Sequence, residues 1–281
     1  MKRALGLIAG LILGISITGY SQVFDSPPRD GVYDKIHTRE KKPVPYAPLR
    51  EADVFWVKRV WRVIDFREKQ NHPFYYPTEP AQGRTNFMTM LVSALKEGSL
   101  LAFDGMDDEF KKPRTWEELE KSMVSKDTLS IEDPDNPGFF KDTVMDRSLD
   151  VSKVKKLRIK EEWFIDKQRS VQDVRILGFC PVLDAVDEQG NYKGTQPLFW
   201  IYFPDARQVM AKTEVYNAKN DAERRTWDDI FWKRMFFSYV TKESNVYDRG
   251  IGEYSSGMDA LYEAERVKEE IFKQEHDMWE F

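Results

Sequence analysis

The sequence predicts an α+β fold, with a central, largely antiparallel sheet flanked by amino- and carboxy-terminal helices and an extended Pro-rich N-terminal arm. Segments with helical periodicity occur early and late in the 281 residues, and strand-like segments occupy the middle. This order favours α+β over a regular βαβ alternation. Cys180 is the single cysteine, so stability must come from a hydrophobic core rather than from an internal disulfide.

Residues 1–21 are predicted to be a signal peptide. Two basic residues precede an apolar run from Ala4 to Ile17, and the small residues Gly19 and Ser21 occupy the positions that precede a cleavage site. The alternative is a transmembrane anchor, but about 14 apolar residues are few for a membrane span. No cysteine follows the run, so we expect a mature chain without a lipid anchor or a transmembrane segment.

Cleavage after residue 21 would remove two of the 43 basic residues and leave 41 against 48 acidic ones. A net charge of −7 with mixed signs along the chain argues against a nucleic-acid partner. The next segment, 22–49, is predicted to be the extended arm, because its five prolines remove backbone donors. The arm is either a flexible tether or a strap that orders against a partner.

Residues 50–281 are predicted to form a single α+β domain. Its first element is expected to be a helix from Glu51 to Arg67, in which apolar residues recur at spacings of three and four and cover most sides. Further helices are expected at Thr85–Glu97, with Gly98 as its stop, after Thr115 and after Thr226, the last two with capping-box spacing, and at Met258–His276. The helix after Thr226 is expected to carry the apolar residues up to Phe237. The buried stripe of the last helix is expected to be Leu261, Ala264, Val267 and Ile271. Strands are expected at Leu100–Phe103, Leu157–Ile165, Val174–Leu183 and Pro197–Phe203, with an irregular or hairpin insertion near 123–150.

The chain offers few groups that could converge into a catalytic site. None of its three histidines has metal-ligand spacing, and it lacks a nucleophile elbow, a phosphate loop and a dinucleotide fingerprint. We therefore predict no catalytic, cofactor-binding or metal-binding residue and no cofactor. One alternative stays open, a periplasmic cell-wall-acting hydrolase whose carboxylate site would lie near Glu117, Asp228 or His276.

Aromatic residues are unusually frequent, at 14% of the chain with eight tryptophans. Aromatic side chains fill cores, and they are also enriched in protein interfaces. The candidate contact surfaces are the arm, the segment 51–67 and the outer side of the last helix. The residues predicted to contact a partner are Trp56, Trp61, Phe55, Pro43, Pro45 and Tyr46. For Trp56 and Trp61, the alternative is a role in the core.

Several sequence blocks resemble the GldN family. They are Arg50–Val54, Lys58–Trp61, Pro197–Arg207, Glu214–Ala222, Thr226–Phe231, Ser244–Arg249 and Glu275–Trp279. The resemblance covers the whole mature chain and is weakest in residues 105–155. The carboxy-terminal blocks are long and specific.

The resemblance implies a non-catalytic periplasmic structural subunit of the type IX secretion system. On this interpretation the chain forms a ring complex with a GldK-type outer-membrane lipoprotein and lies at the inner face of the outer membrane through that partner. It would also self-associate within the ring, contact a GldM-type periplasmic shaft protein and support protein secretion and gliding motility. The family has no established catalytic residues, so the resemblance assigns none to this chain.

Overall fold

The structure, a computed structural model, describes Val32 and residues 36–81, 83–123, 125–132, 140–147, 151–186, 192–217 and 219–278. The chain divides into two units, Met1–Lys35 and Ile36–Phe281. The helices and strands below all belong to the second unit. The predicted signal peptide, most of the first part of the predicted arm (residues 22–31 and 33–35) and residues 133–139 of the predicted insertion lie outside the described residues.

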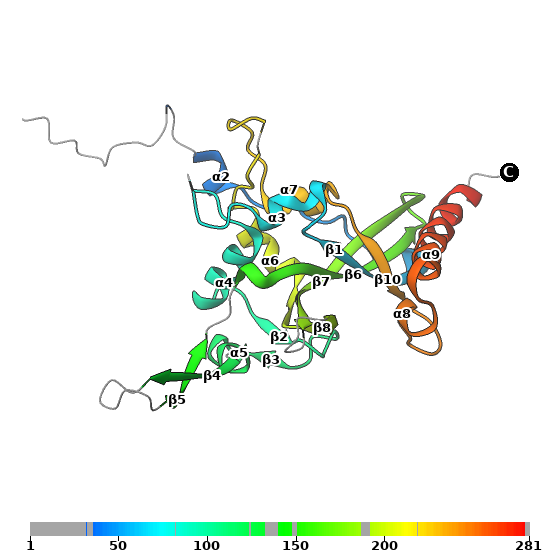
Figure 1. The fold of residues 1–281 in the computed structure, drawn as a ribbon. Helices are drawn as coiled ribbons and strands as arrows, with labels where there is room; N and C mark the ends of the chain where they lie inside the picture. The colour runs from blue at the N-terminus through cyan, green and yellow to red at the C-terminus, as the bar shows by residue number, and fades with distance from the viewer. Residues whose placement is uncertain are drawn as a thin grey trace, which may run out of the picture. The chain divides into compact units, whose positions relative to one another are not determined.

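An antiparallel sheet forms the centre of the second unit (Figure 1). Its described strands follow the order β10-β1-β6-β7-β9-β2-β3, and β8 pairs with β7. Each of these pairs is antiparallel, so the predicted α+β fold with a central antiparallel sheet is confirmed. The strands are β1 (Val54–Asp65), β2 (Ala102–Asp104), β3 (Pro113–Arg114), β6 (Val154–Asp166), β7 (Val171–Val186), β8 (Tyr192–Pro197), β9 (Phe199–Tyr202) and β10 (Tyr239–Glu243).

Helices precede, interrupt and follow the sheet. They are α2 (Ile36–Glu40), α3 (His72–Tyr75), α4 (Phe87–Lys96), α5 (Trp116–Met123), α6 (Phe203–Met210), α7 (Trp227–Trp232), α8 (Ile251–Tyr254) and α9 (Gly257–Asp277), with 3-10 turns at Glu51–Asp53, Lys69–Asn71 and Val151–Lys153. The strands β4 (Ser125–Glu132) and β5 (Phe140–Arg147) form a separate antiparallel hairpin. This hairpin lies within the insertion predicted near 123–150.

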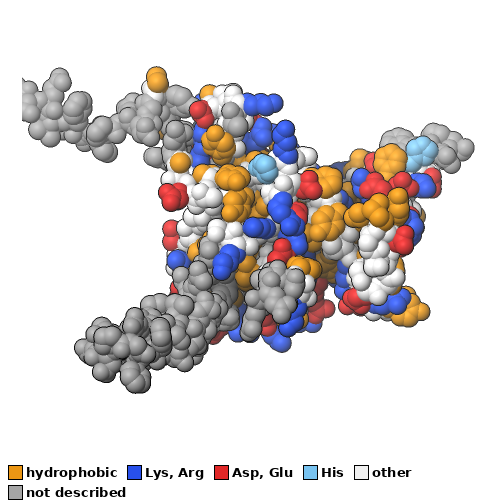
Figure 2. Space-filling view, in the orientation of Figure 1, with side chains coloured by type: hydrophobic (Ala, Val, Ile, Leu, Met, Phe, Trp, Pro, Cys, Tyr) orange, Lys and Arg blue, Asp and Glu red, His pale blue; other side chains and the backbone are white. Residues whose placement is uncertain are grey.

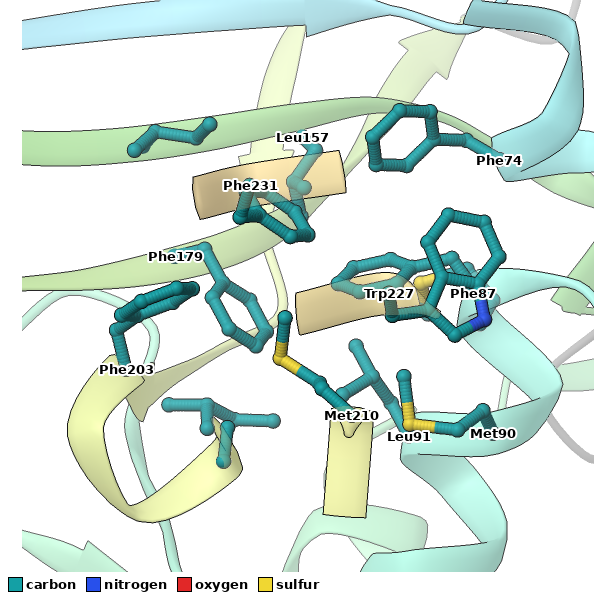
Figure 3. Packing of buried hydrophobic residues seen from close by; sticks show 14 of the residues in the cluster. Phe74, Phe87, Met90, Leu91, Leu157, Phe179, Phe203, Met210, Trp227 and Phe231 are labelled. Atoms are coloured by element: carbon teal, nitrogen blue, oxygen red, sulfur yellow. The ribbon is translucent and has the colours of Figure 1, made fainter. Parts of the chain in front are cut away.

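The main core lies between the sheet and the helices α3, α4, α6 and α7 (Figure 3). Aromatic rings dominate it. The ring of Phe231 lies 6.1 Å from that of Phe179 on β7 and 5.5 Å from that of Phe87, and Trp227 lies 5.1 Å from Phe74. Such offset and edge-on ring pairs add to the free energy of burial. Much of the aromatic content is therefore structural.

The loop between β2 and β3 covers part of the other face of the sheet. Phe110, at φ 60°, places its ring against Gly178 of β7, where an added Cβ would lie 2.5 Å from a ring carbon. The indole N–H of Trp200 donates to the carbonyl of Gly105 at 3.1 Å. Glycine at 178 is thus required by the close approach of the ring.

Helix α9 covers the start of β1 through a second, smaller core. Its buried residues Ala264, Val267 and Ile271 pack with Val60 of β1 and Val240 of β10. Near the tip of the β6–β7 hairpin, the Gln172 amide donates to the carbonyl of Ile271 at 3.3 Å. The capping boxes predicted at Thr115 and Thr226 are present at the starts of α5 and α7.

The predicted helix from Glu51 to Arg67 is wrong, because this segment contains the twelve-residue strand β1. Eight of its residues are β-branched or aromatic, the types that favour strands. Its second half is buried on both faces, and four of the five residues Val60–Ile64 are apolar, so there is no alternation of apolar and exposed polar residues. In such a run, helical spacings of three and four occur by default and do not distinguish a helix from a strand.

Two smaller predictions also need correction. The helix that begins after Thr226 ends at Trp232, and Arg234 adopts a left-handed conformation with φ 51°, so the apolar residues 235–237 lie beyond the helix. In α9, Leu261 belongs to the exposed side and not to the buried stripe, which is shifted to Ala264, Val267 and Ile271.

Candidate interaction surfaces

The six predicted contact residues occupy different environments. Trp61 is only 8% exposed, and its indole N–H donates to the Asp108 carboxylate at 2.9 Å. The ammonium groups of Lys160 and Lys242 lie 5.5 Å and 4.7 Å from the centre of its ring system. Trp56 is half-buried against the core below α9. Both tryptophans therefore have structural roles in this chain, and their contact with a partner stays a prediction.

Phe55 is the most exposed of the aromatic residues among the predicted anchors, at 64%. It borders a hollow of about 380 Å³ that Ile165, Lys167 and Met278 also line. The ammonium of Lys167 lies 5.7 Å from the centre of the Phe55 ring. Val57, two residues along β1 and on the same face, is 48% exposed. The first half of β1 thus presents apolar side chains to the outside.

The described part of the predicted arm lies against its own unit. The ammonium of Lys41 forms an ion pair with Asp229 and donates to the Thr226 hydroxyl at 3.2 Å. Pro43 is half-buried and Pro45 is exposed. Two guanidinium groups face the ring of Tyr46, that of Arg207 at 4.6 Å and that of Arg175 at 4.9 Å from its centre. Residues 41–49 therefore act as an internal strap.

Arg207 supports the strap from below. It forms a two-pronged ion pair with Asp228, at 2.8 Å and 3.2 Å, and both side chains are 5% exposed. The Trp232 ring lies 4.9 Å from the Arg207 guanidinium and 5.2 Å from the Tyr46 ring. Burial raises the pKa of Tyr46, although Arg207 opposes the shift, so the phenol stays neutral over the physiological range. Sequence reasoning missed this cluster, because its members are far apart in the chain.

Helix α9 has apolar side chains on two opposite sides. The inner side is the buried stripe described above. On the outer side, Met258, Leu261, Tyr262 and Phe272 are between 54% and 68% exposed. A helix of a folded monomer normally buries one apolar stripe and presents polar residues elsewhere. The outer side of α9, predicted as a contact surface, therefore carries more apolar area than its own fold uses.

Groups for chemistry are dispersed over the described residues. Glu117 is exposed in the first turn of α5, Asp228 is buried in its pair with Arg207, and His276 is exposed near the end of α9. No group of three His, Cys, Asp or Glu residues in the described part of the chain could hold a metal ion. Burial raises the pKa of the Cys180 thiol to about 12, so this cysteine is not a reactive nucleophile.

The family model described as "Gliding motility associated protein GldN" matches residues 49–280. The chain belongs to the GldN family. The family is associated with gliding motility and type IX secretion. The match begins at Leu49, so most of the strap precedes it, whereas β1, the main core and all of α9 lie within it. A comparison with curated protein sequences finds no match.

Within the described part of this GldN-family chain, no helix combines the length and apolar character needed to cross a membrane. Exposed apolar residues occur in many segments of the described chain, and two groups of them lie on the first half of β1 and on the outer side of α9. The sequence indicated both places. It did not distinguish Phe55, which is exposed, from Trp61, which is buried six positions further along the same strand.

Proposed function

We propose that the chain is a non-catalytic structural subunit of the type IX secretion machinery in the periplasm. It forms a ring complex with a GldK-type lipoprotein at the inner face of the outer membrane and contacts a GldM-type shaft protein. In this role it supports protein secretion and gliding motility by holding its partners in place and transmitting force between them.

One observation carries the proposal beyond the family assignment. Phe55 and the outer side of α9 present large apolar side chains that stay more than half exposed in the monomer. Aromatic residues on rigid elements are the usual anchors of protein interfaces. In an assembly, partner subunits would bury both Phe55 and the outer side of α9.

The scaffold role also fits what holds the chain together. The long strands β1, β6 and β7 pair along most of their lengths, and the buried Arg207–Asp228 pair joins α6 to α7. The hydrolase alternative needs carboxylates that converge on a cleft. Glu117, Asp228 and His276 lie on three different helices, and Asp228 is occupied by Arg207.

The test is sedimentation velocity on residues 22–281, alone and mixed with the soluble part of a GldK-type lipoprotein. We expect a large species that contains both proteins. Two peaks that sediment independently at all concentrations would contradict the proposed ring, and cell-wall hydrolysis would then be assayed directly.

Variants locate the contact. Phe272→Ser and Phe55→Ser should each weaken the complex by tenfold or more if the residue is an interface anchor. Val246→Ser is the control, because Val246 is apolar and 98% exposed but lies beyond β10, away from both surfaces. Unchanged complex formation by both variants would remove these two surfaces from the proposal and leave the ring itself standing.

A further inference from the structure

The outer side of α9 carries a regular stripe. Met258, Tyr262, Glu265, Glu269 and Phe272 follow one another at spacings of four, three, four and three residues, so they line one side of the helix. The buried stripe of Ala264, Val267 and Ile271 lies on the other side. The same heptad-like spacing thus occurs twice on α9, once against its own core and once facing outward.

The outward stripe is acidic as well as apolar. Helix α9 contains seven acidic residues and three basic ones. Glu265 pairs with Lys268 within the helix, and Glu269 has no ion-pair partner among the described residues. A surface of this kind suits a partner that offers basic and apolar groups together.

Such a surface exists on the same chain, where β1 ends and β6 begins. We call it the basic rim, and it consists of Arg67, Lys69, Lys155, Lys156, Tyr192 and Phe237. The Phe66 amide donates to the Lys155 carbonyl at 2.8 Å, which joins the two strand ends. The Asn71 amide bridges the carbonyls of Asp65 and Phe237 at 2.8 Å and 2.9 Å, which brings the loop before β10 to the same place.

The basic rim contains lysines without ion-pair partners among the described residues, and it contains exposed aromatic rings. Arg67 pairs with Asp65, and Lys156 pairs with Asp184 at 2.6 Å while lying 5.2 Å above the Tyr192 ring. Lys69 and Lys155 are exposed, and neither has an ion-pair partner in the described part of the chain. Tyr192 and Phe237 are 62% and 51% exposed. The rim therefore complements the outer stripe of α9 in both charge and apolar character.

The two surfaces lie at opposite ends of the long strands. Lys155 is the second residue of β6, whereas Trp163, near the end of β6, packs against the core below α9. Thirteen residues of strand span roughly 40 Å. Figure 2 shows Lys and Arg side chains gathered where β6 begins and hydrophobic and acidic side chains over α9. Neither surface can therefore satisfy the other within one molecule.

We infer that the outer stripe of α9 docks on the basic rim of a second copy of this chain. The contact is head-to-tail, because it joins two different surfaces of identical molecules. Contacts of this type close into rings or continue into filaments, whereas a two-fold contact stops at a dimer. The opposite charges set the register, and burial of Phe272 and Tyr262 against Tyr192 and Phe237 provides the affinity.

The inference rests on the proposed function in one respect, since it explains how copies of the chain become neighbours in the ring. It makes no use of the lipoprotein partner. The GldK-type protein is expected to bind at another surface, such as that of Phe55. On this inference, Phe272→Ser weakens the complex through the contact between copies.

The experiment is sedimentation velocity over a range of concentrations with paired charge reversals, for the chain alone and with the GldK-type partner. One variant carries Glu265→Lys with Glu269→Lys, and the other carries Lys69→Glu with Lys155→Glu. We expect each to weaken self-association at least tenfold, and salt at about 0.5 M to do the same to the wild type. Mixing the two variants should restore association, because the unaltered rim of one meets the unaltered stripe of the other.

A third pair, Glu79→Lys with Glu97→Lys, changes the same charge at exposed positions on neither surface and should have no effect. Circular dichroism verifies that each variant is folded. Unchanged sizes for both reversals, alone and with the partner, would overturn the inference while a ring with the partner would preserve the proposed function. Charge-dependent self-association without any binding to the partner would support the inference and contradict the proposed function.

Discussion

The two halves of β1 have similar composition but differ in how far their side chains are buried. In Val60–Ile64 all five side chains are buried, whereas in Val54–Arg59 half-buried and exposed side chains alternate. The second half pairs with β10 as well as β6, and it places Val60 in the core beneath α9 and Ile64 in the main core. The first half pairs with β6 alone, and its Trp56 is only partly buried at the edge of the core beneath α9. Burial along this strand is decided by what lies above it, and the half with less cover is where the chain is available to partners.

The closed end comprises Val60–Ile64 and the helices α4, α6 and α7. The open end comprises Val54–Arg59, the tip of the β6–β7 hairpin and α9. If the contrast is correct, substitutions at the closed end should cost stability, and those at the open end should cost assembly.

The largest loss of stability is expected from Asp228→Ala at the closed end. The change leaves the Arg207 guanidinium buried without its counter-charge, and breaking a buried pair in this way costs about 3–5 kcal/mol. Urea unfolding followed by fluorescence measures the change. Asp205→Ala, an exposed carboxylate in the first turn of α6, is the control and should cost less than about 1 kcal/mol. Similar losses of unfolding free energy for the two variants would show that solvent reaches the Arg207–Asp228 pair.

The next largest effect compares the two halves of β1 directly. Ile64→Ala removes a fully buried side chain and should cost about 2–5 kcal/mol. Phe55→Ala removes a larger side chain from an exposed position and should change the free energy of unfolding by less than about 0.5 kcal/mol. Both are measured by the same urea titration. A decrease of more than about 1 kcal/mol in the free energy of unfolding for Phe55→Ala would mean that Phe55 is buried in solution, against the proposed contrast.

The misassigned first element shows where sequence reasoning stops. Local pattern located the strand β6, the continuous strand β9, helix α4 with its stop at Gly98 and the capped start of α7, because in each the residues that decide the structure are neighbours. In β1 the deciding neighbours are β6 and β10, about 100 and 180 residues away. An apolar run carries no sign of which of its sides will be covered.

The candidate surfaces follow the same rule. The outer stripe of α9 is visible in the sequence as a second set of residues at helical spacing. The strap is not, because Tyr46 meets Arg175 and Arg207 only after the sheet has formed. The basic rim likewise unites residues from four segments of the chain, which only the folded sheet brings together.

A smaller effect is expected where the strap meets the closed end. Tyr46→Ala removes a ring that faces two guanidinium groups and Trp232, and should cost about 1–2 kcal/mol. It should also expose residues 41–49 to limited proteolysis, which mass spectrometry of the first cleavage site measures. Tyr46→Phe keeps the ring and should behave like the wild type. Equal cleavage rates in all three proteins would show that the strap is free.

The smallest expected effect is a pH dependence at the Lys41–Asp229 ion pair. Burial raises the pKa of Asp229, but hydrogen bonds from Lys41 and Thr226 outweigh it and hold the pKa below the ordinary 3.8. A carboxyl whose folded-state pKa is depressed adds stability above its unfolded-state pKa, and that stability is lost as the pH falls through the folded-state value. At pH values above 4, Lys41→Met should therefore lower the melting temperature by a small amount. The difference in melting temperature from the wild type should shrink as the pH falls towards 3.

The matched control lies at the open end. Lys268→Met breaks the Lys268–Glu265 pair on α9, whose side chains are 58% and 59% exposed, so solvent screens the attraction and the variant should differ little from the wild type at any pH. A pH-dependent loss at Lys41 and none at Lys268 would mean that the strap is a built part of the closed end. If neither variant shows a pH dependence, the ion pair at the strap is as weak as a surface pair. Residues 41–49 are then held by Tyr46 and by the hydrogen bond that Arg175 donates to the Ala47 carbonyl at 2.6 Å.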